Sequence, residues 1–232
     1  MRGQDRERVR ALELFRNMEK ARFDALMAAA QLQRFPRNVE LVRAGERPQF
    51  LHVLLDGLLE CYVESDGRRT ILRMIKPVVA CMLPAIIGDQ PYLVSAGTLN
   101  GAEVLTVPAA PLRNYAREDL GLAGAVTAEM AKNLRIYVKE FEKLKLRGGL
   151  QRLAAFLLGA DAEAGRTGRI ELPFEKRKLA SLLGMSPENL SRALTALTAN
   201  AVEVRGRAIR IRDRDALVET AHFDPLIDDP KL

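Results

Sequence analysis

The fold is decided by residues 173–211, which read PFEKRKLASLLGMSPENLSRALTALTANAVEVRGRAIRI. Residues 175–183 carry apolar side chains at the spacing of a short helix, and Gly184-Met185 supplies a turn signal. Ser186 followed by Pro187 predicts the start of a second helix, because serine is a strong N-cap and proline is favoured at the first helical position. The stretch therefore predicts two short helices joined by a tight turn.

The second predicted helix has two distinct faces. Three- and four-residue steps stack on one side of a helix, so Glu188, Ser191 and Arg192 share a polar face near its N-terminus. The opposite, buried face is expected to consist of Leu190, Ala193, Leu194 and Leu197. Two β-type runs then flank Arg205-Gly206-Arg207, at residues 201–204 and 208–211. These features predict a helix-turn-helix followed by a two-stranded wing with a basic tip.

The polar residues of this stretch suit DNA. Arg192 can make a bidentate contact to guanine, and Glu188 can accept from the amino group of cytosine. Contacts to the phosphate backbone, which position a protein without reading sequence, are expected from Lys176, Lys178, Arg205 and Arg207. The alternative is a helical pair with ordinary surface charges. Residues 148–218 hold 12 Lys/Arg and 8 Asp/Glu, so most of the net charge of +6 lies in this part of the chain.

A long amphipathic helix is predicted upstream, because apolar residues recur at alternating three- and four-residue steps. They are Leu120, Ala123, Thr127, Met130, Leu134, Tyr137, Phe141 and Leu144. Such a stripe is typical of a coiled-coil seam between two copies of a chain; the alternative is a single helix packed on its own domain. The expected dimer interface is Met130, Leu134, Tyr137, Phe141 and Leu144. Gly148-Gly149 then predicts a stop and a hinge.

The N-terminal half has a different pattern. Residues 9–32 have helical spacing, and short β-type runs follow at 50–55, 58–63 and 70–75. Asp56-Gly57 and Asp66-Gly67 lie between these runs and predict hairpins. Regularly spaced short strands favour a sandwich or a small barrel.

Composition excludes several classes of protein. The chain has 232 residues, of which 48% are hydrophobic and 28% charged, and it has no apolar run long enough for a membrane helix. Together with a charged N-terminus, this predicts a cytoplasmic protein without a membrane partner. Two cysteines, Cys61 and Cys81, lack the spacing of a zinc or iron–sulfur site. His52 and His222 are the two histidines, too few for a histidine-rich metal centre.

At this point the whole chain resembles the Crp/Fnr superfamily of bacterial transcription regulators. The resemblance rests on Gly45-Glu46, on residues 54–59 (LLDGLL) and on Asp66-Gly67-Arg68-Arg69, besides the C-terminal motif. It implies an α+β protein with a cyclic-nucleotide-binding-like β-roll, a long dimerisation helix and a winged helix-turn-helix. The corresponding domains are residues 1–118, 119–147 and 148–232.

Residues 186–192 (SPENLSR) resemble the recognition helix of the Fnr branch. The resemblance implies that Glu188, Ser191 and Arg192 read bases, and that a homodimer binds double-stranded DNA at a TTG-N-type palindrome and contacts RNA polymerase. Pro187 with Glu188 is most similar to the Dnr/Nnr regulators, which respond to nitric oxide. The resemblance favours an activator, although the residues themselves do not separate activation from repression.

The sensor half departs from the cyclic-nucleotide binders. Where these carry a glutamate for the ribose and an arginine for the phosphate, this chain has Ala80-Cys81-Met82 and Pro91-Tyr92-Leu93. A buried phosphate without a cationic partner is strongly disfavoured, so we expect no binding of cyclic AMP. The absence of cysteines before Cys61 excludes the iron–sulfur cluster of oxygen-sensing Fnr proteins.

Haem remains a candidate cofactor, because the resemblance includes the carbon monoxide and nitric oxide sensors of the family, which use haem. Cys81 and His52 are the candidate effector-site residues, with Met82 and Tyr92 lining the pocket. The alternatives are a small buried hydrophobe for Cys81 and a structural, hydrogen-bonded role for His52.

The alternative to a regulator is a protein of a different class, either a β-roll module that binds a small molecule or a cupin-like enzyme with an accessory helical domain. A cupin-like enzyme would need a histidine–carboxylate metal set or a nucleophile–base pair. His52 is the single histidine before residue 222, so neither set is present. We therefore expect a regulator and no enzyme activity.

Overall fold

The computed structural model describes residues 3–229, and it contains two compact units, Met1–Leu134 and Arg135–Leu232. The division falls inside the longest helix, α6 (Leu120–Leu146). The sequence-based boundaries at residues 118 and 147 follow the two ends of this helix and stay a prediction.

The N-terminal segment forms three helices rather than the single one predicted for residues 9–32. They are α1 (Gly3–Arg10), α2 (Glu13–Arg16) and α3 (Lys20–Ala28), and strand β1 begins directly afterwards, at Gln31. The chain turns between α2 and α3, where the backbone N–H of Glu19 donates to Oδ2 of Asp119 at 2.8 Å. This long-range hydrogen bond and the burial of Phe15 and Phe23 on either side of the turn override the helical spacing.

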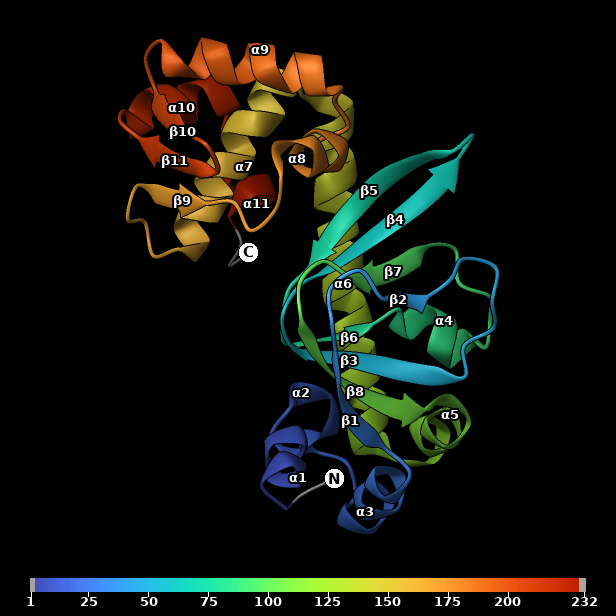
Figure 1. Cartoon of the computed structure of the whole chain (residues 1–232). Coiled ribbons are helices and arrows are strands. Elements are labelled where there is room, and N and C mark those ends of the chain that lie inside the picture. The colour runs from blue at the N-terminus through green and yellow to red at the C-terminus, as the bar shows by residue number, and fades with distance from the viewer. Residues whose placement is uncertain (1–2, 230–232) are drawn as a thin grey trace. The chain divides into compact units, whose positions relative to one another are not determined.

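Two four-stranded antiparallel sheets make up the β-roll (Figure 1). The first sheet has the order β1 (Gln31–Phe35), β8 (Ala102–Pro108), β3 (Phe50–Asp56) and β6 (Val79–Cys81). The second has the order β2 (Glu40–Val42), β7 (Ser95–Thr98), β4 (Leu59–Ser65) and β5 (Arg68–Ile75). The predicted β-roll is therefore confirmed, and the three predicted strands correspond to β3, β4 and β5.

The two Asp-Gly steps have different roles. Asp66-Gly67 closes the predicted hairpin, since Ser65 pairs with Arg68 and β4 pairs with β5 along its length. The hairpin predicted at Asp56-Gly57 is wrong, because β3 and β4 belong to different sheets. Gly57 has a φ of 95°, and a Cβ atom there would lie 2.3 Å from the carbonyl oxygen of Gly101. Glycine is thus required at a corner where the chain passes from one sheet to the other.

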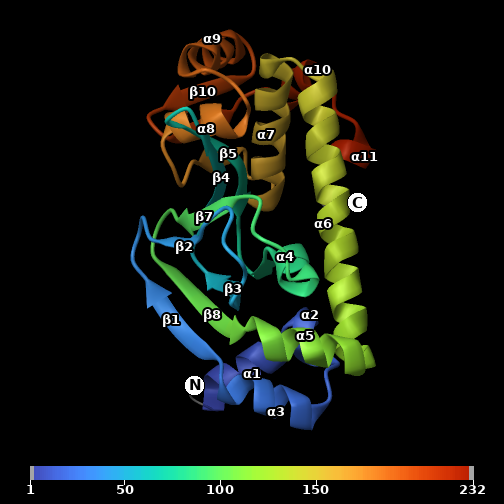
Figure 2. The same cartoon turned by 90° about the vertical axis from the view of Figure 1, so that its right-hand side faces the viewer.

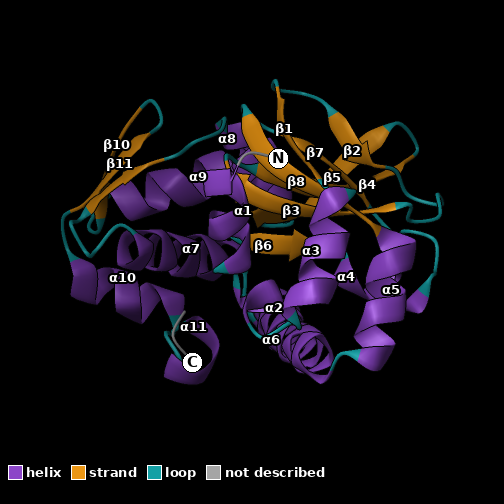
Figure 3. Ribbon diagram, turned by 90° about the horizontal axis from the view of Figure 1, so that it is seen from below, coloured by secondary structure: helices purple, strands orange, loops and turns teal. Residues whose placement is uncertain are grey.

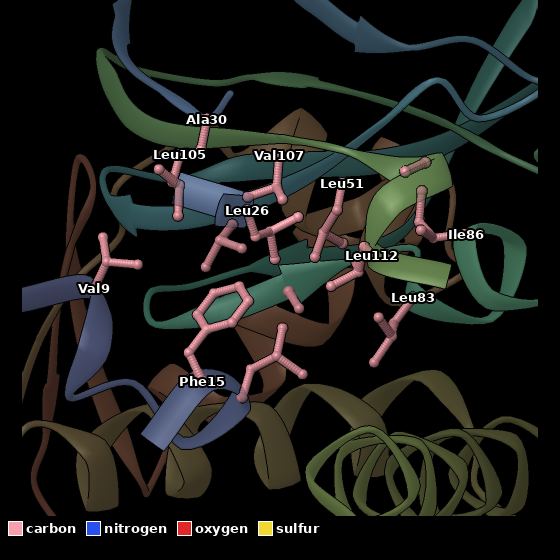
Figure 4. Close-up of a cluster of buried hydrophobic side chains, with 14 of the residues drawn as sticks. Val9, Phe15, Leu26, Ala30, Leu51, Leu83, Ile86, Leu105, Val107 and Leu112 are labelled. Carbon is pink, nitrogen blue, oxygen red and sulfur yellow. The ribbon is translucent and has the colours of Figure 1, made fainter. Parts of the chain in front are cut away.

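Alternate residues of β3 face two different cores. Leu51, Val53 and Leu55 pack in a large cluster with the N-terminal helices, with α4 (Leu83–Gly88) and with α5 (Ala109–Glu118), as Figure 4 shows for its central residues. Leu54, between them, packs in a smaller cluster. That cluster joins β3 and β8 to β4 and β5, and therefore fills the space between the sheets.

Helix α6 is continuous over 27 residues (Figure 2). Its first turns pack on the β-roll core through Leu122 and Val126, which are buried. Asp119 caps it, since its Oδ1 accepts the backbone N–H of Leu122 at 2.9 Å. The buried side of these first turns is therefore formed by residues outside the predicted apolar stripe.

The second unit continues from α6 into a helical domain with a small sheet (Figure 3). Its elements are α7 (Gly149–Glu163), β9 (Arg169–Glu171), α8 (Lys176–Leu182), α9 (Pro187–Thr198), β10 (Val202–Arg205), β11 (Ala208–Ile211), α10 (Arg214–Ala221) and α11 (Pro225–Asp228). The helix-turn-helix and the wing are confirmed as elements. The wing has a third strand that was not predicted, because β9 pairs with β11. Within residues 3–229, no helix is both long and apolar enough to cross a membrane.

Candidate nucleic-acid interface and sensor pocket

The turn between α8 and α9 is built by local signals in the sequence. Gly184 adopts a φ of 61°, a left-handed conformation that glycine enters without steric cost. Ser186 then caps α9, because its Oγ accepts the backbone N–H of Asn189 at 3.2 Å. Pro187 occupies the first turn, where no backbone donor is needed. These residues set the direction of α9 and therefore the face that it presents.

Helix α9 presents the three predicted base-reading residues together. Glu188, Ser191 and Arg192 are exposed, whereas the predicted buried face, Leu190, Ala193, Leu194 and Leu197, is buried. Hydrogen bonds from its own backbone N–H and from Ser186, together with the charge of Arg192, hold the pKa of Glu188 below its usual value. At neutral pH the face therefore offers a carboxylate acceptor and a guanidinium donor one helical turn apart.

A groove of about 330 Å³ runs beside this face, between α8, α9 and β10. Lys176 and Arg177 line it from α8, and the hydroxyl-bearing residues Ser191, Thr195 and Thr198 line it from α9. It contains no carboxylate among its lining residues, so its chemistry suits an anion such as a phosphate. Lys178, the other predicted backbone contact on α8, is partly buried and is not part of this lining.

The wing carries the two remaining predicted contacts at its tip. Arg205 and Arg207 flank Gly206 and are exposed. Arg205 is paired with Glu203 at 2.7 Å, and Arg207 lies 4.0 Å from Glu171. Exposed pairs of this kind contribute little energy, so either arginine can exchange its carboxylate for a phosphate.

The stripe predicted for α6 is apolar and exposed along the second half of the helix. The exposed fractions are 65% for Leu134, 51% for Tyr137, 62% for Phe141 and 53% for Leu144. Met130 differs, because it is partly buried against the core of the first unit. An exposed row of large apolar side chains is unusual for a monomer and marks an interaction surface.

In the β-roll, the structure brings two of the four predicted pocket residues side by side. His52 on β3 pairs directly with Cys81 on β6 and with Thr106 on β8. Directly paired residues point to the same face of a sheet, here the face of Leu54 and of the inter-sheet core. Met82 follows Cys81 and packs against the same cluster, whereas Tyr92 packs in the large cluster and donates its hydroxyl to the carbonyl oxygen of Phe50.

His52, Cys81 and Thr106 form a row across three strands of the first sheet, and burial keeps this row uncharged. Burial lowers the pKa of His52 to about 4 and raises the pKa of Cys81 to about 12 and that of Cys61 to about 11. The row therefore consists of a neutral imidazole, one protonated thiol and a hydroxyl, and the protonated thiol of Cys61 lies on β4 of the other sheet. Thr106 Oγ1 is buried and has no hydrogen-bond partner among the described residues. Across residues 3–229, no group of three or more His, Cys, Asp or Glu side chains could hold a metal ion.

Sequence reasoning missed several of these residues. Thr195 and Thr198 follow Ser191 at four- and seven-residue spacing, a helical pattern that could have revealed them. Thr106 carries no local signal, since only strand pairing places it beside His52. Arg73 on β5 likewise could not be predicted to donate to the side chain of Asn133 on α6, at 3.1 Å.

Comparison with known families and structures agrees with this geometry. Residues 32–119 match the cyclic nucleotide-binding domain family, and residues 151–220 match the Crp-like helix-turn-helix domain family. The chain belongs to the Crp/Fnr family of transcription regulators. It is thus a DNA-binding regulator, and α8 and α9 both lie within the matched helix-turn-helix domain.

Individual relatives of this Crp/Fnr regulator support the assignment. The nitrogen fixation regulation protein FixK of Azorhizobium caulinodans is 26% identical over 191 residues, which are 79% of this chain and 76% of FixK. The structure of FixK2 from Bradyrhizobium japonicum has 25% identity and a TM-score of 0.72, and the match covers 82% of this chain and 96% of FixK2. A Crp/Fnr-family regulator from Eubacterium rectale shares the fold, with 19% identity, a TM-score of 0.76 and coverage of 91% and 99%. The assignment to the Dnr/Nnr branch stays a prediction.

Proposed function

We propose that this Crp/Fnr regulator acts as a homodimer that binds an inverted repeat of TTG-N-type half-sites and activates transcription through RNA polymerase. The observation that carries the proposal is the exposed face of α9, where Glu188, Ser191 and Arg192 lie together. Arg192 is assigned to a guanine and Glu188 to a cytosine amino group. Lys176, Lys178, Arg205 and Arg207 are assigned to the phosphate backbone.

The second half of α6 supports the dimer. Leu134, Tyr137, Phe141 and Leu144 recur at heptad spacing and are at least half exposed. A second copy of the same stripe would bury all four in a parallel coiled coil, with the two-fold axis along the seam. Two-fold symmetry of the protein in turn requires two inverted half-sites in the DNA.

We propose that the effector is a small molecule other than cyclic AMP, bound on the row formed by His52, Cys81 and Thr106. The row is uncharged, and an unpaired hydroxyl beside a neutral imidazole favours a ligand with polar groups but no net charge. A phosphate diester does not match such a lining.

Haem with nitric oxide is the specific candidate, and the two predicted ligands differ in fit. Burial raises the pKa of Cys81 to about 12, so this thiol would have to release its proton to coordinate iron. His52 fits, because its imidazole is neutral and therefore keeps a lone pair for the metal. Bound haem would supply an iron atom that takes up nitric oxide. A Soret band that appears on adding haem and is lost in His52→Leu supports this assignment, whereas no band, or an unchanged band in His52→Leu, rejects it.

The DNA assignment is tested by comparing a base contact with a backbone contact. Arg192→Ala is expected to weaken binding to the cognate duplex by about 1–3 kcal/mol and to relax discrimination at one guanine. Arg207→Ala is expected to weaken binding to every duplex alike and to reduce the salt slope by about one unit. Both variants are titrated with cognate and base-substituted duplexes across a salt series. Equal loss for every duplex in Arg192→Ala would make Arg192 a phosphate contact and contradict the proposal.

A further inference from the structure

The last described residues of the chain return to α6. After α10, His222 adopts a φ of 49°, and Asp224 caps the short helix α11 by accepting the backbone N–H of Leu226 at 2.9 Å. Beyond this turn, the carbonyl oxygen of Asp229 accepts a hydrogen bond from Nζ of Lys139 on α6 at 3.1 Å. We call residues 222–229 the C-terminal strap. They lie outside the matched helix-turn-helix family, which ends at residue 220.

A buried ion pair anchors the strap. Arg147 directly follows α6, and its two terminal nitrogens donate to the two carboxylate oxygens of Asp228, each at 2.7 Å. The side chains are only 8% and 3% exposed. Arg147 also donates to the carbonyl oxygen of His222 at 3.0 Å, so one guanidinium holds both ends of the strap.

The charges around the pair reinforce it. Burial by itself would raise the pKa of Asp228, but hydrogen bonds from Arg147 and from the backbone N–H of Asp224, with the charge of Lys143, lower it below the usual value. Lys139, Lys143 and Arg147 follow one another at four-residue steps and so lie along one side of the chain. A buried pair of this geometry is strongly disrupted when one partner is removed, because the other charge is left uncompensated.

The same arginine lies at the junction of α6 and α7, where two glycines follow it. Arg152 on α7 joins the junction to the helix-turn-helix, because it donates to the carbonyl oxygens of Arg147 at 2.6 Å and of Leu183 at 2.9 Å. The side chain of Met185, in the helix-turn-helix turn, approaches to 2.8 Å from the place where a Cβ atom of Gly149 would lie. The strap and this turn therefore both contact the chain at the predicted Gly148-Gly149 hinge, the strap through Arg147 and the turn through Met185.

We propose that Arg147 and Asp228 are positioning residues, which fix the direction in which α7 leaves α6 and thereby the distance between the two recognition helices of the dimer. The inference rests on the proposed dimer on an inverted repeat. A dimer whose junction is rigid fits one spacing of half-sites, whereas a junction freed by loss of the strap also accepts neighbouring spacings. The strap thus acts on the choice of spacing and leaves the reading of each half-site to α9.

The test measures spacing preference in the full-length protein. Arg147→Gln, Asp228→Asn and the double variant are titrated with inverted repeats of the preferred spacer and of spacers one base pair shorter and longer. Each single variant is expected to lose about fivefold or more of the parent's preference between spacers. The double variant is expected to lose no more than either single variant, because the two residues form one interaction. Glu219→Gln, which removes an exposed carboxylate from α10, is the matched control and is expected to keep the parent's preference.

A second measurement does not depend on DNA. The backbone N–H of Arg147 donates to the carbonyl oxygen of Lys143 at the end of α6, and that of Arg152 donates to the carbonyl oxygen of Gly148 at the start of α7. These two hydrogen bonds flank the junction, and their hydrogen exchange is expected to accelerate in both single variants. The proposal is overturned if the single variants keep both the parent's preference between spacers and the parent's rate of hydrogen exchange. It is also overturned if the single variants bind DNA tightly and keep the parent's preference between spacers. If the parent binds no inverted repeat, the proposed function fails, and hydrogen exchange alone then decides whether the strap holds the junction.

Discussion

The exposed stripe of α6 leads to the strongest prediction, that Leu134→Glu combined with Phe141→Glu converts the protein to monomers. Full burial of a leucine or phenylalanine side chain is worth about 1.5–3 kcal/mol. Leu134 is 65% exposed and Phe141 is 62% exposed, so most of this gain is still available to an interface. Each side chain therefore contributes about 1–2 kcal/mol on dimerisation.

The loss of dimer stability is large because each substitution occurs in both chains of a symmetric dimer. The four side chains of a dimer together contribute about 4–8 kcal/mol to dimerisation. Losing this contribution raises the dimer Kd by about three to six orders of magnitude. Like charges placed opposite one another along the seam add to the loss. Both substituted residues are at least half exposed in the single chain, so its own fold is expected to survive.

Sedimentation velocity across a concentration series measures the change directly. The matched control is Ala128→Glu combined with Lys132→Glu, because both residues are exposed on α6 and lie off the stripe. The control is expected to remain dimeric. A tight dimer of the Leu134→Glu/Phe141→Glu variant would show that the interface lies elsewhere, and the reasoning from the exposed stripe would be wrong.

Three further predictions concern the sensor domain and the recognition helix. Calorimetric titration with cyclic AMP is expected to give no saturable heat, because Pro91 stands where the cyclic-nucleotide binders carry an arginine; saturable binding in the micromolar range would contradict this. Burial lowers the pKa of His52 from 6.5 to about 4. The unfolded chain therefore binds an extra proton between these values, and stability falls as the pH drops through that window, by about 3 kcal/mol in total. Urea unfolding at pH 7 and pH 4.5 is expected to show most of this loss as the difference between the parent and His52→Leu; equal losses in both would place the titration on another group. Ser186→Ala is expected to lower the free energy of unfolding by about 1 kcal/mol, because it removes the cap of α9, whereas Ser186→Asp keeps the cap. Urea unfolding measures both variants, and equal stability of the two would rule out the cap.

Much of the DNA-binding half could be predicted from the sequence, because its signals act over a few residues. The cap at Ser186, the proline after it and the left-handed glycine at 184 are set by backbone sterics and by hydrogen bonds to near neighbours. The faces of α9 and the stripe of α6 follow from helical periodicity alone. The exposed and buried faces of α9 were therefore predictable without a structure, and the assignment of Glu188, Ser191 and Arg192 to bases stays a prediction.

Tertiary structure decided the features that depend on pairing between distant segments. The Asp56-Gly57 step looks like a hairpin turn locally, yet β3 and β4 enter different sheets, since burying both of their apolar faces requires the chain to cross between layers. His52, Cys81 and Thr106 become neighbours only through the register of three strands. Arg147 and Asp228 are 81 residues apart, and no local pattern relates them. Local sterics and capping act within a turn or two of the chain, whereas strand order, register and buried ion pairs are set by the burial and electrostatics of the whole folded unit.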